Sequence, residues 1–185
     1  RVEYGVLRGL IRDLPFVEWR KNIADLRSRI SSKEAYDSAY LGCLEELSAG
    51  VTTIGDTTST GAAVFAAQDC GLRAVVYREA GAIDKRLVNY AMKKVDSDLE
   101  KWSQSIDEDR IMLGIAPDPV YECHPELYRC AAKYASEHND LPIAMKLAGS
   151  NEELRFVKDG ATAGLDNTVD HRGFMEVPPW LPTAV

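Results

Sequence analysis

Five charged residues stand at or near the carboxyl ends of apolar segments in this sequence: Asp56, Arg78, Glu79, Asp118 and Lys146. If those segments are parallel strands, their carboxyl ends meet at one edge of the sheet, where α/β proteins place their chemistry. Three carboxylates and two cations gathered there could bind a polar ligand or transfer protons. Alternatively, each side chain caps a loop or a helix or faces water, and for Asp56 and Asp118 both interpretations stay open.

Glu79 and Lys146 are candidates of a second kind, because both adjoin residues that we expect in buried strands. Lys146 lies between Met145 and Leu147, and a lysine in a central strand needs a partner for its amine. We therefore name Lys146 and Asp118 as candidate catalytic residues. Glu79 and Asp118 are the residues that we expect to bind a substrate.

The histidines give little support for a metal centre formed by this chain alone. His124 precedes a proline where a helix is expected to begin, His138 lies near the end of the same helix, and His171 lies in an irregular region. None has the His-x-His or His-x3-His spacing that brings two imidazoles to one ion. The sequence therefore predicts no bound metal, and its candidate ligands, if one is present, are Asp56, Asp118 and His124.

Four apolar segments with helical patterns between them supply the expected strands, at 51–54, 72–77, 111–116 and 142–147. The helix before the first strand begins with a capping box, Ser31-x-x-Glu34. Short apolar strands that alternate with helices pair in parallel. Right-handed crossovers then leave an open doubly wound sheet or part of a βα-barrel, whose complete form typically has about 250 residues. We predict an α/β fold of four parallel βα units, half of a (β/α)8 barrel, in residues 1–160, with an irregular tail at 161–185.

The composition excludes several classes of protein. The 185 residues carry 22 Lys and Arg against 29 Asp and Glu, a net charge of −7, with no basic cluster to bind nucleic acid. No apolar run approaches the roughly 20 residues of a membrane-spanning helix. We therefore expect neither a nucleic-acid nor a membrane partner. Four cysteines without a Cys-x-x-Cys pair, and the lack of a charged and then apolar leader, predict a cytoplasmic protein with reduced thiols.

A series of segments, in order along residues 1–160, resembles one enzyme family. The segments are Glu3–Gly9, Leu14–Trp19, Glu45–Asp56, Ile115–Pro117, Pro125–Leu127, Leu141–Ile143 and Glu152–Gly160. They are similar to the amidohydrolase superfamily, in its chlorohydrolase and deaminase branch, which acts on adenosine-type, guanine, cytosine and triazine substrates. The resemblance implies a metal-dependent barrel hydrolase, in which a divalent ion, often zinc or iron, lowers the pKa of the attacking water.

The resemblance also implies which positions would carry that chemistry, and this chain departs from the pattern there. The family's first-strand His-x-His pair falls just before Arg1. Its fifth-strand His-x-x-Glu, a metal ligand followed by the general acid and base, corresponds to Lys146 and Gly149. Its substrate-contacting His corresponds to Asp118, and its remaining ligands fall beyond Val185. An ammonium is a poor zinc ligand and glycine transfers no proton, so we expect the chain as it stands to be inactive.

Three functions remain open. The chain is a fragment or divergent member of the hydrolase family, with a small nitrogenous ring compound as ligand and no cofactor of its own. Alternatively, it is a non-catalytic half-barrel, structural or ligand-binding, whose open sheet edges and apolar barrel-facing surface are covered in a homo-oligomer. Lys146 could then pair with Asp118 or Glu79 and replace the charge of the metal. The third is a flavodoxin-like domain that binds a ligand above the strand ends.

Overall fold

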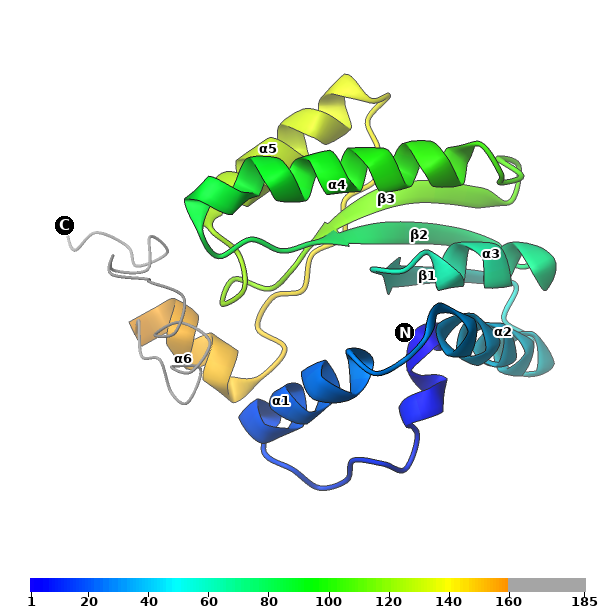
Figure 1. Cartoon of the computed structure of the whole chain (residues 1–185), viewed down its shortest axis with the longest axis horizontal. Helices are drawn as coiled ribbons and strands as arrows, with labels where there is room; N and C mark the ends of the chain where they lie inside the picture. The colour runs from blue at the N-terminus through cyan, green and yellow to red at the C-terminus, as the bar shows by residue number, and fades with distance from the viewer. Residues whose placement is uncertain (160–185) are drawn as a thin grey trace.

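The computed structural model describes residues 1–159. Helices and strands alternate in the order η1 (Val2–Leu7), α1 (Phe16–Arg27), α2 (Ser32–Ser48), β1 (Thr53–Thr58), α3 (Ala62–Asp69), β2 (Arg73–Ala80), α4 (Lys85–Ser103), β3 (Ile111–Pro117), α5 (Pro125–Glu137) and α6 (Asn151–Asp159) (Figure 1). The predicted tail at 161–185 lies outside the described residues. Within residues 1–159, no helix is long and apolar enough to cross a membrane.

The strands form one parallel sheet in the order β1, β2, β3, which confirms the predicted α/β class and parallel pairing. Residues that pair across neighbouring strands point to the same face of a sheet. One face, called the inner face here, carries three register pairs of β2 and β3: Val75 with Met112, Tyr77 with Gly114, and Glu79 with Ala116. The alternate residues of β2, such as Val76, point to the outer face, where they are buried.

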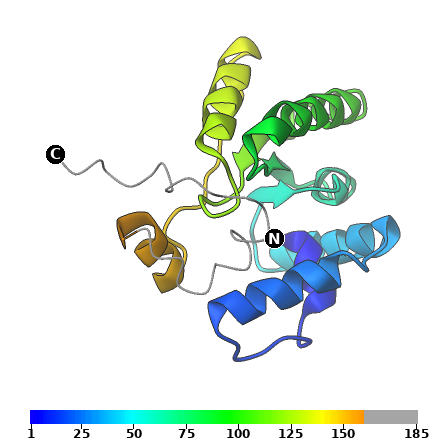
Figure 2. The same cartoon turned by 60° about the vertical axis from the view of Figure 1, so that its left-hand side comes forward.

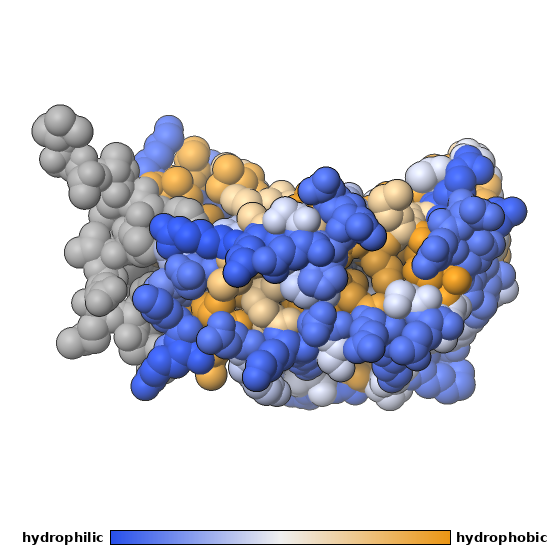
Figure 3. Space-filling model, turned by 90° about the horizontal axis from the view of Figure 1, so that it is seen from above, coloured by the Kyte–Doolittle hydropathy of each residue, from blue (hydrophilic) through white to orange (hydrophobic). Residues whose placement is uncertain are grey.

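Helices cover the outer face of the sheet. α3 packs on all three strands, α4 on β2 and β3, and α5 on β3. Figure 2 shows α2, α3, α4 and α5 following one another around the outside of the strands, as in part of a βα-barrel. Fully buried apolar side chains fill the space between the layers, among them Val64, Val76, Val88, Ile111 and Leu127. Figure 3 shows the molecule from above, turned by 90° from the view of Figure 1. Hydrophilic side chains cover much of this surface, with apolar patches between them.

The fourth predicted strand is reduced to a single bridge, in which Ile115 pairs in parallel with Ile143. The Ile115 N–H donates to the Pro142 carbonyl and the Ala144 N–H donates to the Ile115 carbonyl, both at 3.0 Å. To extend the ladder in this register, the backbone nitrogen of Pro142 would have to donate a hydrogen bond to β3. On the other side of the bridge, the backbone nitrogen of Pro117 would have to donate one to Ala144. Proline has no N–H to donate, so the two prolines end the pairing on either side of the bridge.

Strands β1 and β2 run further than their predicted segments. β1 includes Asp56, and β2 includes both Arg78 and Glu79, so these side chains extend from strands and not from the loops that follow. The predicted capping box is confirmed, because the Ser31 Oγ accepts from the Glu34 N–H and the Glu34 carboxylate accepts from the Ser31 N–H. The capping box in the sequence therefore located the start of α2. The β-branched composition of the strands did not locate where β1 and β2 end.

Gly114 is the residue that allows the bridge segment to approach the inner face. A Cβ built at Gly114 lies 2.5 Å from the Pro142 carbonyl oxygen and 2.7 Å from the Tyr77 ring. We predict that Gly114→Ala lowers the free energy of unfolding by about 2 kcal/mol, because the Pro142 carbonyl accepts a bridge hydrogen bond and cannot move away without breaking it. Gly55→Ala is the matched control on β1, where a Cβ meets only the Tyr77 ring at 3.9 Å. Equal urea-unfolding midpoints for the two variants would contradict this account.

Candidate active site

A cavity of about 330 Å³ at the carboxyl end of the sheet brings together four positions that the sequence singled out. Its walls include Glu79, Asp118, Lys146 and Gly149, which come from β2, the end of β3 and the segment after the bridge. α1 closes another side of the cavity. A small apolar cluster that includes Phe16, Val120, Tyr121 and Phe156 holds α1 against the segment after β3 and against α6.

Glu79 is the centre of the charge arrangement in this cavity. Its side chain is buried, and three cations surround it: Arg1 in direct ion-pair contact, Arg27 with Nη2 at 3.5 Å and Lys146 with Nζ at 3.6 Å. Burial opposes ionisation of this carboxyl, but Arg1, Lys146 and Arg27 outweigh burial and hold the pKa of Glu79 below its ordinary value. Glu79 is therefore an anion that its cations already neutralise.

Lys146 forms one of the two ion pairs considered from the sequence, the pair with Glu79. The expectation that Lys146 adjoins buried strand residues is wrong, however, because Met145 and Leu147 are both exposed. The Lys146 side chain is 57% exposed, because the single bridge at Ile143 leaves the following residues without a strand to pack in. The pair is thus buried at its Glu79 end and open to water at its lysine end.

Asp118 directly follows β3 and lies half-buried in the same cavity. Its N–H donates to the Ala80 carbonyl at 2.8 Å, and its carboxylate lies where a side chain on Gly81 would stand. Burial, together with the nearby charges of Glu79 and Glu122, raises the pKa of Asp118 to about 7. Near neutral pH this carboxyl can therefore hold or release a proton.

The other predicted positions lie elsewhere. Arg78 points to the outer face, where its Nε donates to Asp98 of α4 at 2.7 Å. Asp56 accepts from the Val2 N–H at 3.1 Å and so anchors η1. His124 caps α5, with its Nδ1 accepting from the Glu126 N–H at 3.0 Å.

The residues present do not fit a metal centre. Across residues 1–159, no three His, Cys, Asp or Glu side chains lie close enough together to hold an ion. The carboxylate best placed in the cavity, Glu79, is already surrounded by three cations, which would repel another. The candidate ligands Asp56, Asp118 and His124 are not brought together, since only Asp118 lines the cavity.

Sequence reasoning missed the two arginines that complete the site. Arg1 lies at the start of the sequence and Arg27 in the last turn of α1, 52 residues before Glu79. Neither arginine follows a strand. A search for functional residues at the carboxyl ends of strands therefore does not find them. The aromatic walls of the cavity were also missed, although Phe16 and Trp19 belong to a segment that carried the family resemblance.

Comparison with known proteins places the chain in a family. Residues 1–177 match the amidohydrolase family, and the chain belongs to it. Curated relatives of the chain include several methylthioadenosine/S-adenosylhomocysteine deaminases. The deaminase of that name from Carboxydothermus hydrogenoformans is 28% identical over 160 residues, which are 85% of this chain and 36% of the relative. The corresponding enzyme of Thermococcus kodakarensis is 32% identical over 141 residues, 74% of this chain and 33% of the relative.

Solved structures show the same fold. Zinc-bound atrazine chlorohydrolase from Arthrobacter aurescens superposes with a TM-score of 0.69 at 17% sequence identity, over 97% of this chain and 43% of the enzyme. Aminofutalosine deaminase from Helicobacter pylori gives a TM-score of 0.62 over 77% of this chain. The chain spans less than half the length of the relatives it matches. Its three strands and their helices therefore correspond to part of an amidohydrolase barrel.

The charge arrangement makes Glu79 and Lys146 unequal in their effect on stability. Glu79→Gln leaves the buried Arg1 guanidinium without its counter-charge, and we expect a loss of about 3 kcal/mol in the free energy of unfolding. Lys146→Met removes a mostly exposed ammonium at 3.6 Å, and we expect a loss of below about 1 kcal/mol. Urea unfolding of both variants measures the difference. No loss in Lys146→Met would show that the Lys146–Glu79 pair contributes nothing.

The raised pKa of Asp118 gives a pH dependence with a definite sign. The folded chain keeps this proton up to about pH 7, whereas an unfolded Asp releases it near 3.8, so stability falls as pH rises through this window. We predict that Asp118→Asn gains stability relative to the parent as pH rises from about 4 to about 8. Thermal unfolding across this range measures the gain. A difference between Asp118→Asn and the parent that stays flat across this range would contradict the prediction.

Proposed function

We propose that this chain is a partial amidohydrolase of the deaminase and triazine hydrolase branch that does not perform metal-dependent hydrolysis by itself. One observation carries the proposal: Lys146 places its Nζ 3.6 Å from Glu79 in the cavity at the strand ends. By the family resemblance, Lys146 stands where the third histidine ligand belongs. Its ammonium supplies positive charge to the site without a Lewis acid and without an activated water.

The acid and base chemistry is missing at the neighbouring position. Gly149 stands where the resemblance puts the general acid and base. It has no side chain to transfer a proton, and its backbone N–H donates to Glu153 at 2.8 Å. Asp118 is able to exchange a proton near pH 7, but a proton-transfer group alone does not supply the nucleophile of the family reaction. Turnover by this chain alone is therefore not expected.

We propose that the same cavity binds a small nitrogen-containing ring compound. Trp19 lines the cavity and is 38% exposed, so it offers an aromatic ring on which a planar ligand can stack. Glu79 and Asp118 offer carboxylate oxygens that accept hydrogen bonds from ring N–H or amino groups. The names of the relatives, deaminases of methylthioadenosine and a hydrolase of atrazine, support this ligand class.

A second candidate function, a non-catalytic half-barrel that works as a homo-oligomer, is favoured by the apolar residues of the inner face and the bridge segment. Met112 is 56% exposed, and Ile143, Met145 and Leu147 are 45%, 48% and 59% exposed. Among the described residues, β1 pairs only with β2, which leaves its other edge open. A second copy of the chain that covers this face and edge would bury both.

Metal content and native mass, measured on one purified sample, test the proposal. We expect zinc, iron and manganese far below one ion per chain, together with a mass above that of the monomer. Near-stoichiometric metal would overturn the non-catalytic proposal, and a monomeric mass would overturn the oligomer. Calorimetric titration of the same sample with 5'-methylthioadenosine and with atrazine tests the ring ligand. Binding that weakens in Trp19→Ala but not in Trp102→Phe would support it, and no binding of either compound would overturn it.

A further inference from the structure

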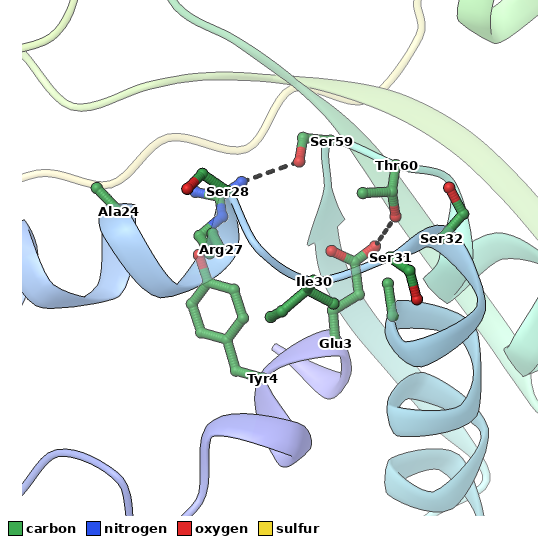
Figure 4. A pocket seen from close by; sticks show the side chains of 11 residues that line it. Glu3, Tyr4, Ala24, Arg27, Ser28, Ile30, Ser31, Ser32, Ser59 and Thr60 are labelled. Carbon is green, nitrogen blue, oxygen red and sulfur yellow. Dashed lines mark hydrogen bonds between the residues drawn. The ribbon is translucent and has the colours of Figure 1, made fainter.

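A second cavity, of about 360 Å³, adjoins the candidate active site, and Figure 4 shows the residues that line it. η1, the end of α1, the first turn of α2 and the loop after β1 enclose it. Arg27 and Tyr4 border both this cavity and the one around Glu79. Its volume lies within the range of roughly 300–1,000 Å³ that is usual for small-molecule sites.

A buried carboxylate, Glu3, forms one polar wall of this cavity. Glu3 is 5% exposed, and its Oε1 accepts from the hydroxyls of Thr58 and Thr60, the latter at 2.9 Å. Its other oxygen points away from Thr60, toward the space that Arg27 borders (Figure 4). The structure shows no hydrogen bond to that oxygen from any residue in 1–159. Glu3 is therefore held in place with one acceptor still available to a ligand.

Donors lie on the opposite wall. The Arg27 guanidinium donates to the Ser59 Oγ at 2.9 Å, and Ser59 keeps its own hydroxyl proton for another acceptor (Figure 4). Ala24, Ile30 and Ala35 contribute apolar side chains to the lining, and Ile30 lies between Arg27 and Glu3 (Figure 4). A ligand here meets an acceptor on one side, a donor on the other and an apolar surface between them.

The charges of this cavity disfavour an anion. Arg27 already faces Glu79 at 3.5 Å, so its charge is partly neutralised, and an anion would also approach Glu3. The N-terminus of α2 is closed, because the Glu34 carboxylate accepts from the Ser31 N–H at 2.8 Å. A simple cation is also disfavoured, because the Arg27 guanidinium would repel it. Hydroxyl groups both donate to Glu3 and accept from Ser59 and Arg27, and they carry no charge.

We propose that this cavity is a binding site for a neutral cyclic polyol, such as a pentose or an inositol. Its ring C–H groups pack on the side chain of Ile30, between Arg27 and Glu3. One of its hydroxyls donates to the free oxygen of Glu3, and another accepts from Ser59. This inference does not depend on the function proposed for the cavity around Glu79.

Amide NMR of the full chain, titrated separately with D-ribose and myo-inositol, tests the proposal. We expect saturable shifts at Ser32, Ser59 and Thr60, at the roughly millimolar affinity of a small ligand with few polar contacts. Absence of saturable shifts with both polyols would overturn the proposal. Shifts confined to Trp19 and Gly149 would also overturn it, because those residues line the other cavity.

Variants and comparison ligands make the test specific. Ser59→Ala should weaken polyol binding about fivefold, the effect of one lost hydrogen bond. Ser136→Ala is the matched control, since that hydroxyl bonds the Lys133 carbonyl on α5, outside the cavity. Glu3→Gln should weaken binding further if the variant folds, and Ser59→Ala decides the matter if it does not. Unchanged affinity in Ser59→Ala, or saturable shifts with inorganic phosphate or glycine in place of the polyols, would overturn the proposed ligand class.

Discussion

Neutralisation of one buried carboxylate, that of Glu79, organises the carboxyl end of this molecule. An unpaired buried carboxylate is costly, and Glu79 is stabilised by cations from three separate segments. Arg1 precedes η1, Arg27 ends α1, and Lys146 follows the bridge to β3. The ion pairs of Glu79 therefore connect the N-terminal segment, α1 and the segment after the bridge to β2, the middle strand of the sheet. Residues of those segments line the two cavities at this end, and Arg27 lines both.

This charge arrangement differs from a metal centre, although the chain shares its fold with an atrazine chlorohydrolase whose structure contains zinc. A metal centre needs several ligands that converge with free lone pairs. Here the carboxylate at the centre already accepts from cations, and the described residues bring no three ligands together. A fixed ammonium or guanidinium supplies charge but does not polarise a bound water as a Lewis acid does. The fold is thus that of the family, while residues 1–159 bring no metal-binding group together at this site.

The edge of the sheet beyond β3 follows from the chemistry of proline. With Pro117 and Pro142 on either side, Ile115 and Ile143 form one bridge, and the chain then leaves the sheet. The apolar residues of that segment stay exposed, as does Met112 on the inner face. An exposed apolar face beside an open strand edge is unusual for a monomer. The same short bridge positions Lys146, so the exposure of this apolar segment and the ion pair with Glu79 share one cause.

The sequence by itself determined the α/β class, the order of helices and strands, the capping box at Ser31 and the family resemblance. Each of these depends on residues close together in the chain, through periodicity, caps and motifs. The partners of Glu79 and the loss of the fourth strand were decided only by the tertiary structure. Arg27 contacts Glu79 although 52 residues separate them in the sequence. A proline interrupts a strand ladder only where the register requires its backbone nitrogen to donate to the neighbouring strand. Long-range contact and register are properties of the folded chain, which no local pattern encodes.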